Sequence, residues 1–159
     1  MKKKQEVRII LQNVRSALNV GAIFRTADAA GVSKIYLAGY TPTPIDRFGR
    51  VRPDLAKSAL GAEKTVAWEA APDILKLLEK LKKENVQIVA IEQSKKSVDY
   101  KKIKLESSVA FLYGNEVSGL PETILKLADI VAEIPMKGKK ESLNVSVSVG
   151  VSLFRALNL

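Results

Sequence analysis

Two residue types are missing from this chain of 159 residues, cysteine and histidine. The absence of cysteine excludes a disulfide framework, a thiolate nucleophile and a cysteine-ligated metal. The absence of histidine excludes the Ser-His-Asp triad and removes the commonest general base and metal ligand. An enzyme with this composition must act through Arg, Lys, Asp, Glu, Ser, Tyr, Asn or backbone groups, or through a cofactor that supplies the difficult chemistry.

Long apolar segments are missing too. No stretch approaches the length of a membrane span, about 20 residues. The start, MKKKQEVRII, is basic but lacks the apolar region and cleavage site of a signal peptide, so we expect a cytoplasmic protein. No linker, low-complexity tract or internal repeat is present, and the length suits a single domain over residues 1–159.

Acidic residues are few relative to basic ones. The chain has 26 Lys and Arg against 17 Asp and Glu, a net charge of +9. A compact basic domain suits a phosphate-rich partner such as nucleic acid. A solvated lysine-rich surface that only confers solubility gives the same count, so charge alone leaves both interpretations open.

Short apolar runs alternate with helical patterns along the chain, which predicts an α/β fold with a largely parallel sheet. The strands are expected at residues 7–11, 34–38, 65–68, 86–91, 109–113 and 130–135. The helices are expected at residues 19–31 with Asn19 as N-cap, at 55–61, at 72–84, and from Pro121 over PETILKLA. Residues 39–54, rich in Pro, Gly and Arg, predict a long functional loop.

The end of the chain, ESLNVSVSVGVSLFRALNL, is ambiguous. From Val145 to Val151 valine alternates with Ser or Gly, which is typical of a half-buried strand. Read at helical spacing, the same segment has a continuous face, made of Leu143, Val147, Gly150, Val151, Phe154 and Asn158. These residues alone leave strand and helix open.

The phosphate-binding motifs of common α/β proteins are absent. No G-x-G-x-x-G follows an expected strand, and no G-x-x-x-x-G-K-[ST] occurs. The segment FLYGNEVSGLP has two suitably spaced glycines, but Leu120 and Pro121 stand where a P-loop needs Lys and Ser or Thr. A Rossmann dehydrogenase and a P-loop NTPase are therefore poor fits.

Three polar clusters remain. The first, NVGAIFRTADAAG, places Arg25 six positions after Asn19; the second, GNEVSGL, follows an apolar strand, where ligands bind in α/β proteins. The third, IPMKGKKESLNVSV, combines Ser142 and Asn144 with a lysine run. Taken singly, they fit a capped helix, an ordinary turn and a solvated charged loop.

Together and in this order, the clusters resemble the motifs of the SpoU (TrmH) family of RNA ribose 2′-O-methyltransferases, within the SPOUT superfamily. The likeness runs from about Val7 to Leu159. The motif matches are Asn19 with Arg25, then Gly114-Asn115-Glu116 with Gly119-Leu120, then Ile134-Pro135-Met136 through Ser142-Leu143-Asn144-Val145-Ser146-Val147. The resemblance implies a parallel-sheet α/β knot with a deep C-terminal trefoil knot, and a helix from about Asn144 to Leu157.

The resemblance also implies a reaction, methyl transfer from S-adenosyl-L-methionine to a ribose 2′-hydroxyl, with S-adenosylhomocysteine as product. The catalytic residues that it implies are Arg25, Asn19, Glu116, Ser142 and Asn144. A guanidinium stays protonated at ordinary pH, so Arg25 acts either as a base beside a phosphate or, as we favour, only by positioning the hydroxyl. Glu116 would hold Arg25 or a backbone amide, or merely cap a turn.

Two binding surfaces follow from the same resemblance. The residues expected to bind the cofactor are Ile91, Glu92, Gly114, Asn115, Ile134, Met136, Leu143 and Val145. The residues expected to bind RNA are Arg47, Arg50, Arg52, Lys137, Lys139 and Lys140. No metal and no membrane contact are expected.

The resemblance further implies a homodimer through the knot region and, for a bare catalytic core without an RNA-binding extension, tRNA rather than rRNA as substrate. Three alternatives stay open. A base-methylating knotted enzyme is opposed by the pair Asn19 and Arg25, and a silent RNA-binding relative by the intact motif residues. A Rossmann-like binding protein would lack the knot.

Overall fold

The computed structural model describes residues 4–159, so the first three residues of the basic start lie outside the described part. Seven parallel strands form one sheet in the order β3-β2-β1-β6-β4-β7-β5. Their bounds are β1 Glu6–Gln12, β2 Lys34–Ala38, β3 Ala67–Ala71, β4 Gln87–Ile91, β5 Val98–Asp99, β6 Ser108–Tyr113 and β7 Ile130–Glu133. The expected parallel α/β architecture is confirmed.

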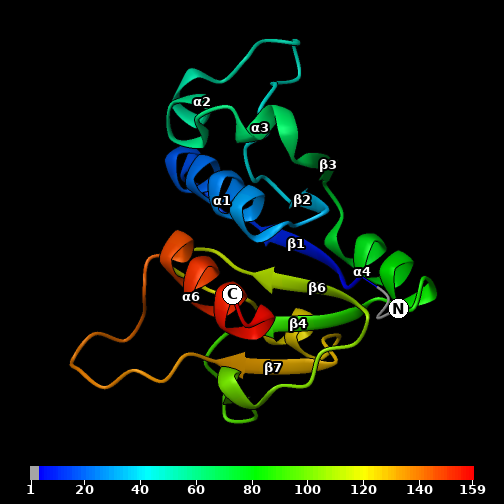
Figure 1. The fold of residues 1–159 in the computed structure, drawn as a ribbon, viewed down its shortest axis with the longest axis vertical. Coiled ribbons are helices and arrows are strands. Elements are labelled where there is room, and N and C mark those ends of the chain that lie inside the picture. The colour runs from blue at the N-terminus through cyan, green and yellow to red at the C-terminus, as the bar shows by residue number, and fades with distance from the viewer. Residues whose placement is uncertain (1–3) are drawn as a thin grey trace.

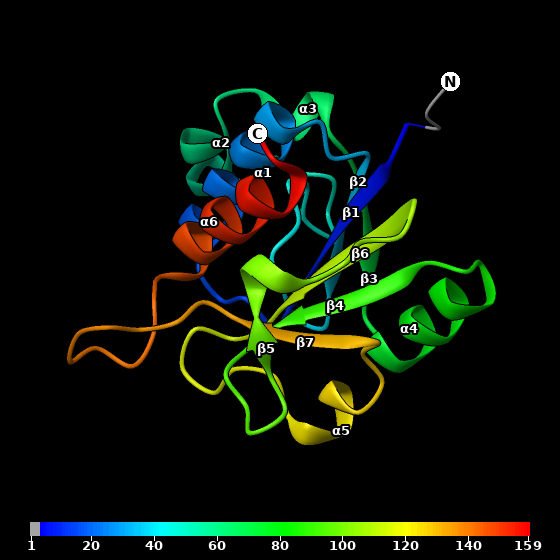
Figure 2. The same ribbon diagram turned by 60° about the horizontal axis from the view of Figure 1, so that its bottom comes forward.

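Helices cover both faces of this sheet (Figures 1 and 2). The first face carries α1 (Ala17–Ala30), α2 (Pro53–Ala59), α3 (Ala62–Thr65) and α6 (Val145–Leu157). The second face carries α4 (Ile74–Lys83) and α5 (Glu122–Leu125), and a 3₁₀ turn η1 (Tyr100–Lys102) follows β5. No helix among residues 4–159 is both long and apolar enough to cross a membrane.

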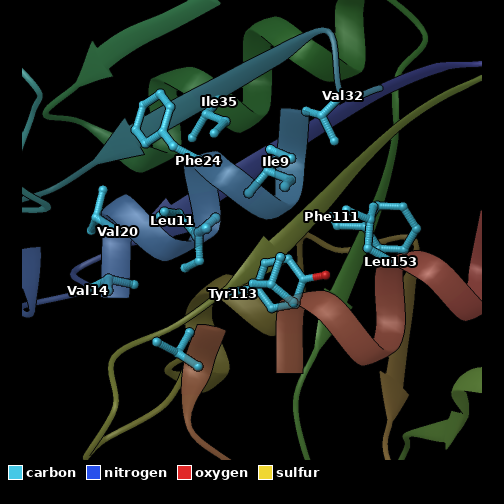
Figure 3. Close-up of a cluster of buried hydrophobic side chains, with 14 of the residues drawn as sticks. Ile9, Leu11, Val14, Val20, Phe24, Val32, Ile35, Phe111, Tyr113 and Leu153 are labelled. Atoms are coloured by element: carbon cyan, nitrogen blue, oxygen red, sulfur yellow. The ribbon is translucent and has the colours of Figure 1, made fainter. Parts of the chain in front are cut away.

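Two hydrophobic cores result, one on each face. Ile9 and Leu11 of β1 face α1 and α6, whereas Ile10 between them faces α4 and α5. On β6, Tyr113 belongs to the first core and Leu112 to the second. Strands buried on both faces read as continuous apolar runs, as these do. Figure 3 shows the first core, with side chains from β1, β6, α1 and α6 meeting.

The ambiguous tail is a helix, α6, as the family resemblance implied. Asn144 is its N-cap, and its side chain accepts a hydrogen bond from the Ser146 amide. Val145 and Val149, four residues apart, are buried, while Val147 and Val151 are 48% and 38% exposed. The alternation of valine is therefore not a strand pattern: it supplies one buried and one exposed valine pair at helical spacing.

A buried hydrogen bond ties α6 to the sheet. The hydroxyls of Tyr113 on β6 and Ser152 on α6 lie 2.7 Å apart, and Ser152 also donates to the Ser148 carbonyl at 2.6 Å. Complete burial raises the pKa of Tyr113 far above its usual range, so the phenol stays neutral. The tyrosine in Figure 3 points its oxygen at this helix.

Three expected boundaries were wrong. Helix α1 begins at Ala17, because Ser16 rather than Asn19 is the N-cap and accepts from the Asn19 amide. The strand expected at 65–68 runs over Ala67–Ala71, since Thr65 ends α3. Helix α5 stops at Leu125 instead of continuing over PETILKLA. Helix α3, strand β5 and turn η1 were missed.

Candidate active site

A cavity of about 230 Å³ lies at the carboxyl ends of β4, β6 and β7. This edge of a parallel sheet is where α/β proteins bind ligands. The eight residues expected to bind a cofactor all line the cavity: Ile91, Glu92, Gly114, Asn115, Ile134, Met136, Leu143 and Val145. Residues separated along the chain are thus brought to one place by the parallel strands.

The cavity is acidic although the protein is basic. Glu92, Glu116 and Glu141 line it, and within the described residues no Lys or Arg does. The whole chain, in contrast, has a net charge of +9. Carboxylates on the walls of a cleft favour a cationic ligand and oppose phosphate groups. The absence of a phosphate-binding motif in the sequence agrees with this.

Glu92, at the end of β4, holds the loop of the second motif. Its carboxylate accepts hydrogen bonds from the Leu120 amide at 3.0 Å and from the Gln93 amide at 3.1 Å. Gly119 lies against the same carboxylate with φ 65°, and a Cβ added there would stand 2.5 Å from Glu92 Oε2. Both the left-handed backbone conformation and the close approach favour a glycine at this position.

Glu116 connects the second motif to the segment that leads into α1. Its two oxygens accept hydrogen bonds from the backbone amides of Arg15 at 3.1 Å and Ser16 at 3.2 Å. Partial burial alone would raise the pKa of Glu116, but the amide hydrogen bonds outweigh it and lower the pKa. Of the roles expected for Glu116, the structure thus shows contact with backbone amides and none with Arg25.

Asn144 connects the third motif to the first. Its side-chain nitrogen donates to Asn19 Oδ1 at 3.2 Å, across 125 positions of sequence. The side-chain oxygen of Asn144 caps α6, so both ends of the amide are engaged. Ser142 lines the cavity on the loop that leads into this cap.

Two residues that the sequence analysis missed hold Asn115. The side-chain nitrogen of Asn115 donates to the Asn13 carbonyl at 2.8 Å and to the Tyr40 hydroxyl at 3.0 Å. Asn13, with φ 55°, in turn accepts from the Tyr40 amide at 3.0 Å. The available signal was the position of Asn13 directly after the first strand, where polar residues meet at the ligand-binding edge.

Arg25 lies apart from the cavity. It is exposed on α1 and lines a shallow hollow with Lys57 and Leu60 of the α2 region and Phe154 of α6. Its side chain makes no hydrogen bond or ion pair with any residue in 4–159. The structure therefore brings Asn19, Asn144, Glu116 and Ser142 to the cavity or its rim, and leaves Arg25 on an open surface.

The six basic residues expected to bind RNA stand on two loops. Arg47 and Arg50 are exposed and Arg52 is half-buried on the segment between β2 and α2. Lys137, Lys139 and Lys140 are all exposed on the segment between β7 and α6, which projects from the body of the protein in Figure 1.

These features define a class of protein: a parallel α/β fold with a ligand cavity among the loops that follow the strands. The sequence matches the model of the SpoU rRNA Methylase family over residues 6–154. The chain belongs to this family, as the three motifs indicated.

Curated relatives act on two kinds of RNA. The 23S rRNA (guanosine-2'-O-)-methyltransferase RlmB of Xylella fastidiosa is 33% identical over 96% of this chain and 59% of that protein. The tRNA (guanosine(18)-2'-O)-methyltransferase of Aquifex aeolicus is 32% identical over 98% of this chain and 70% of that protein. The chain thus spans about three fifths of the length of the rRNA relative.

Solved structures agree with the fold. The AdoMet-bound rRNA methyltransferase of Sinorhizobium meliloti superposes with a TM-score of 0.86 and 32% identity, covering 99% of this chain and 58% of that one. A structure that concerns 2-OH methylation of C/U34 on tRNA gives a TM-score of 0.81 and 25% identity, covering 96% of this chain and 94% of that one.

Proposed function

We propose that this protein transfers a methyl group from S-adenosyl-L-methionine to a ribose 2′-hydroxyl of RNA. The observation that carries the proposal is the acidic cavity, in which all eight residues expected to bind the cofactor meet. Family membership supports it, because the rRNA and tRNA relatives are both named as 2′-O-methyltransferases.

The lining of the cavity fits this cofactor. S-Adenosyl-L-methionine carries a positive sulfonium, for which the carboxylates of Glu92, Glu116 and Glu141 provide a favourable potential. Ile134 and Met136 supply apolar surface for the adenosine. When bound, the cofactor supplies an activated methyl group and leaves as S-adenosylhomocysteine. A nucleoside triphosphate should bind poorly, because the same glutamates would repel its phosphates.

Arg25 is proposed to position the reacting ribose. Its guanidinium remains a cation with five donors, which can hold a phosphate oxygen and the 2′-hydroxyl together. With the cofactor bound, Arg25 would hold the hydroxyl oxygen towards the methyl group that the cofactor supplies, and the hydroxyl proton would be lost to water. Orientation of this kind accounts for several kcal/mol of a barrier, on the order of 7–11 in well-oriented systems.

The other motif residues are proposed to hold the site in shape. Asn144 and Asn19 bond to each other, so the start of α6 and the first turn of α1 keep a constant separation. Glu116 fixes the start of α1 from the opposite loop through the Arg15 and Ser16 amides. Ser142 is proposed to support the same network from the wall of the cavity.

A second copy of the chain is proposed to complete the site. On α1, Leu18, Ala22 and Arg25 share a face at helical spacing, and the hollow joins this face to Phe154 of α6. Leu18 is 54% exposed, and Val147 and Val151 are exposed on α6, the helix that packs against α1, which leaves apolar surface suited to self-association. The deep trefoil knot implied by the family is part of the same proposal, supported by the superposition on the family structure.

For the substrate we propose tRNA rather than rRNA. The structure that concerns tRNA methylation is matched by this chain over 94% of its own length, which supports tRNA as the substrate. The alignment with the rRNA enzyme of Xylella fastidiosa covers only 59% of that protein. RNA binding should weaken steeply with salt, because each phosphate contact releases counterions. The contacts proposed are those of Arg47, Arg50, Arg52, Lys137, Lys139 and Lys140.

The test is transfer of labelled methyl from S-adenosyl-L-methionine to unmodified bulk tRNA and, separately, to rRNA. Digestion of the RNA then identifies the methylated nucleoside, with Arg25→Ala assayed in parallel. A 2′-O-methyl nucleoside that is lost in the variant is the expected result. A base-methylated nucleoside would refute ribose methylation, and a failure to bind the cofactor in calorimetry would refute the whole proposal.

A further inference from the structure

The loop between β2 and α2 carries an ordered hairpin, residues 45–52, which we call the arginine hairpin. Ile45 and Val51 form an antiparallel bridge that closes it. The carboxylate of Asp46 accepts hydrogen bonds from the Phe48 amide at 2.8 Å, the Arg50 amide at 2.9 Å and Arg50 Nε at 3.0 Å. Gly49, with φ 76°, makes the turn. The hairpin is thus held in shape by its own polar contacts.

An exposed aromatic ring stands at the tip of this hairpin. Phe48 is 66% exposed, although its side chain is wholly apolar. The guanidinium of Arg47 lies 4.8 Å from the ring centroid and that of Arg50 lies 5.0 Å from it. An aromatic face and two guanidinium planes therefore occupy one site on the surface, and no motif of the family accounts for the ring.

We propose that Phe48, with Arg47 and Arg50, forms a stacking platform for an unpaired nucleobase of the RNA substrate. Aromatic rings and guanidinium planes are the groups on which proteins stack splayed-out bases, and the arginines also attract the adjoining phosphates. A paired base offers no free face, so the platform selects a single-stranded segment. This inference rests on the proposed function and adds the substrate feature that the hairpin recognises.

Two other roles fit the contacts less well. Phe48 is not needed to build the hairpin, because Asp46, Gly49 and the bridge between Ile45 and Val51 already order it. A second copy of this chain is a poor occupant, since the hairpin has three arginines against one aspartate and the whole chain is basic. The charge of the tip complements RNA instead.

The test measures binding of two fluorescein-labelled RNAs by anisotropy, an unstructured uridine-rich strand of about 12 nucleotides and a duplex of the same length. Phe48→Leu keeps an apolar side chain but removes the ring, and Phe48→Tyr keeps the ring. Leu75→Ala, at a residue of α4 that is 53% exposed, is the control for loss of exposed apolar surface.

Phe48→Leu is expected to weaken binding of the single strand about ten-fold, the effect of losing one stacked base, and to leave duplex binding unchanged. Phe48→Tyr and Leu75→Ala should bind both RNAs as the unaltered protein does. Ultraviolet cross-linking of the uridine-rich strand should join uridine to the peptide that contains Phe48.

Equal binding of the single strand by Phe48→Leu and the unaltered protein would overturn the platform, as would an equal loss for strand and duplex. An unaltered protein that binds neither RNA would overturn it too. The outcomes separate the two proposals. Methyl transfer with no effect of Phe48→Leu removes the platform alone, whereas a Phe48-dependent affinity without any methyl transfer to tRNA or rRNA removes the proposed function alone.

Discussion

The cavity at the strand ends and the hollow around Arg25 differ in how complete they are within one chain. In the cavity and at its rim, Glu92, Glu116 and Asn144 each have hydrogen-bond partners that hold them in place. In the hollow, Arg25 is exposed and unpaired with any residue in 4–159. The difference indicates that the proposed cofactor site is preformed, whereas the proposed catalytic arginine acquires its partners only from RNA and a second copy.

The largest effect on activity is expected from a substitution in the hollow around Arg25. Arg25→Ala should lower the rate of methyl transfer at least about a hundred-fold, because the variant no longer orients the reacting hydroxyl. Cofactor affinity measured by calorimetry should be unchanged, since Arg25 does not line the cavity. Arg25→Lys is the matched variant; it keeps the charge and should still lose most activity without the planar donor fork. Near-normal activity of Arg25→Ala would contradict the assignment.

The second prediction concerns the surface beside Arg25. Val151→Glu should convert a dimer into a monomer by light scattering, because it places a charge on the exposed face of α6 that we assign to self-association. Methyl transfer should fall by roughly ten-fold or more as the site loses its second copy. Val98→Glu, at a valine of β5 that is 46% exposed, should leave the mass unchanged. A monomeric unaltered protein would refute the role of the surface.

The third prediction probes the preformed cavity. Gly119→Ala should weaken S-adenosylhomocysteine binding about ten-fold, because its Cβ would press on the Glu92 carboxylate and strain a backbone with φ 65°. Gly138→Ala is the control: nothing lies within 4 Å of its added Cβ, and it should bind as before. Calorimetry measures both. Equal affinities would show that the second-motif loop does not shape the cofactor site.

The smallest effect should come from Glu116, whose lowered pKa links its charge to stability. Glu116→Gln should reduce the free energy of unfolding in urea by about 1 kcal/mol at neutral pH. The stabilisation by the carboxylate is present above its unfolded pKa, about 4.3, and is lost as the pH falls through the lower folded pKa. The difference between the two proteins should therefore shrink towards about pH 3.

Glu106→Gln is the control for this pH dependence. Glu106 is exposed, and its carboxylate makes no hydrogen bond or ion pair with residues 4–159. The free energy of unfolding of Glu106→Gln should equal that of the unaltered protein at every pH. A Glu116→Gln deficit that persisted unchanged in acid would show that shape, rather than charge, explains the effect.

Local patterns predicted most elements of the fold. The strand expected at residues 34–38 coincides with β2, and the helix expected at 72–84 contains α4, whose apolar residues Ile74, Leu77, Leu78 and Leu81 are buried at helical spacing. The errors arose where neighbouring residues compete for one role. Ser16 and Asn19 are both good N-cap residues, and in the structure Ser16 takes this role.

Part of the candidate site could likewise be predicted from local sequence patterns. Glycines and polar residues directly after apolar strands marked Gly114, Asn115 and Glu116, and the family resemblance added apolar residues such as Met136 that have no chemical signal of their own. Tyr40 escaped notice because its hydroxyl becomes relevant only through its contact with Asn115. Neither sequence segment alone predicts such a contact.

The sequence by itself determined most of the helices and strands, the three motifs and the basic charge, because each depends mainly on residues close together along the chain. Only the tertiary structure decided what meets at the cavity. The sheet order places β6 between β1 and β4, so Glu116 reaches the start of α1 and Asn144 reaches Asn19 from 125 positions away. The same packing put Arg25 outside the cavity, because it lies on the face of α1 turned away from the sheet, and burial depends on neighbours that no local pattern specifies.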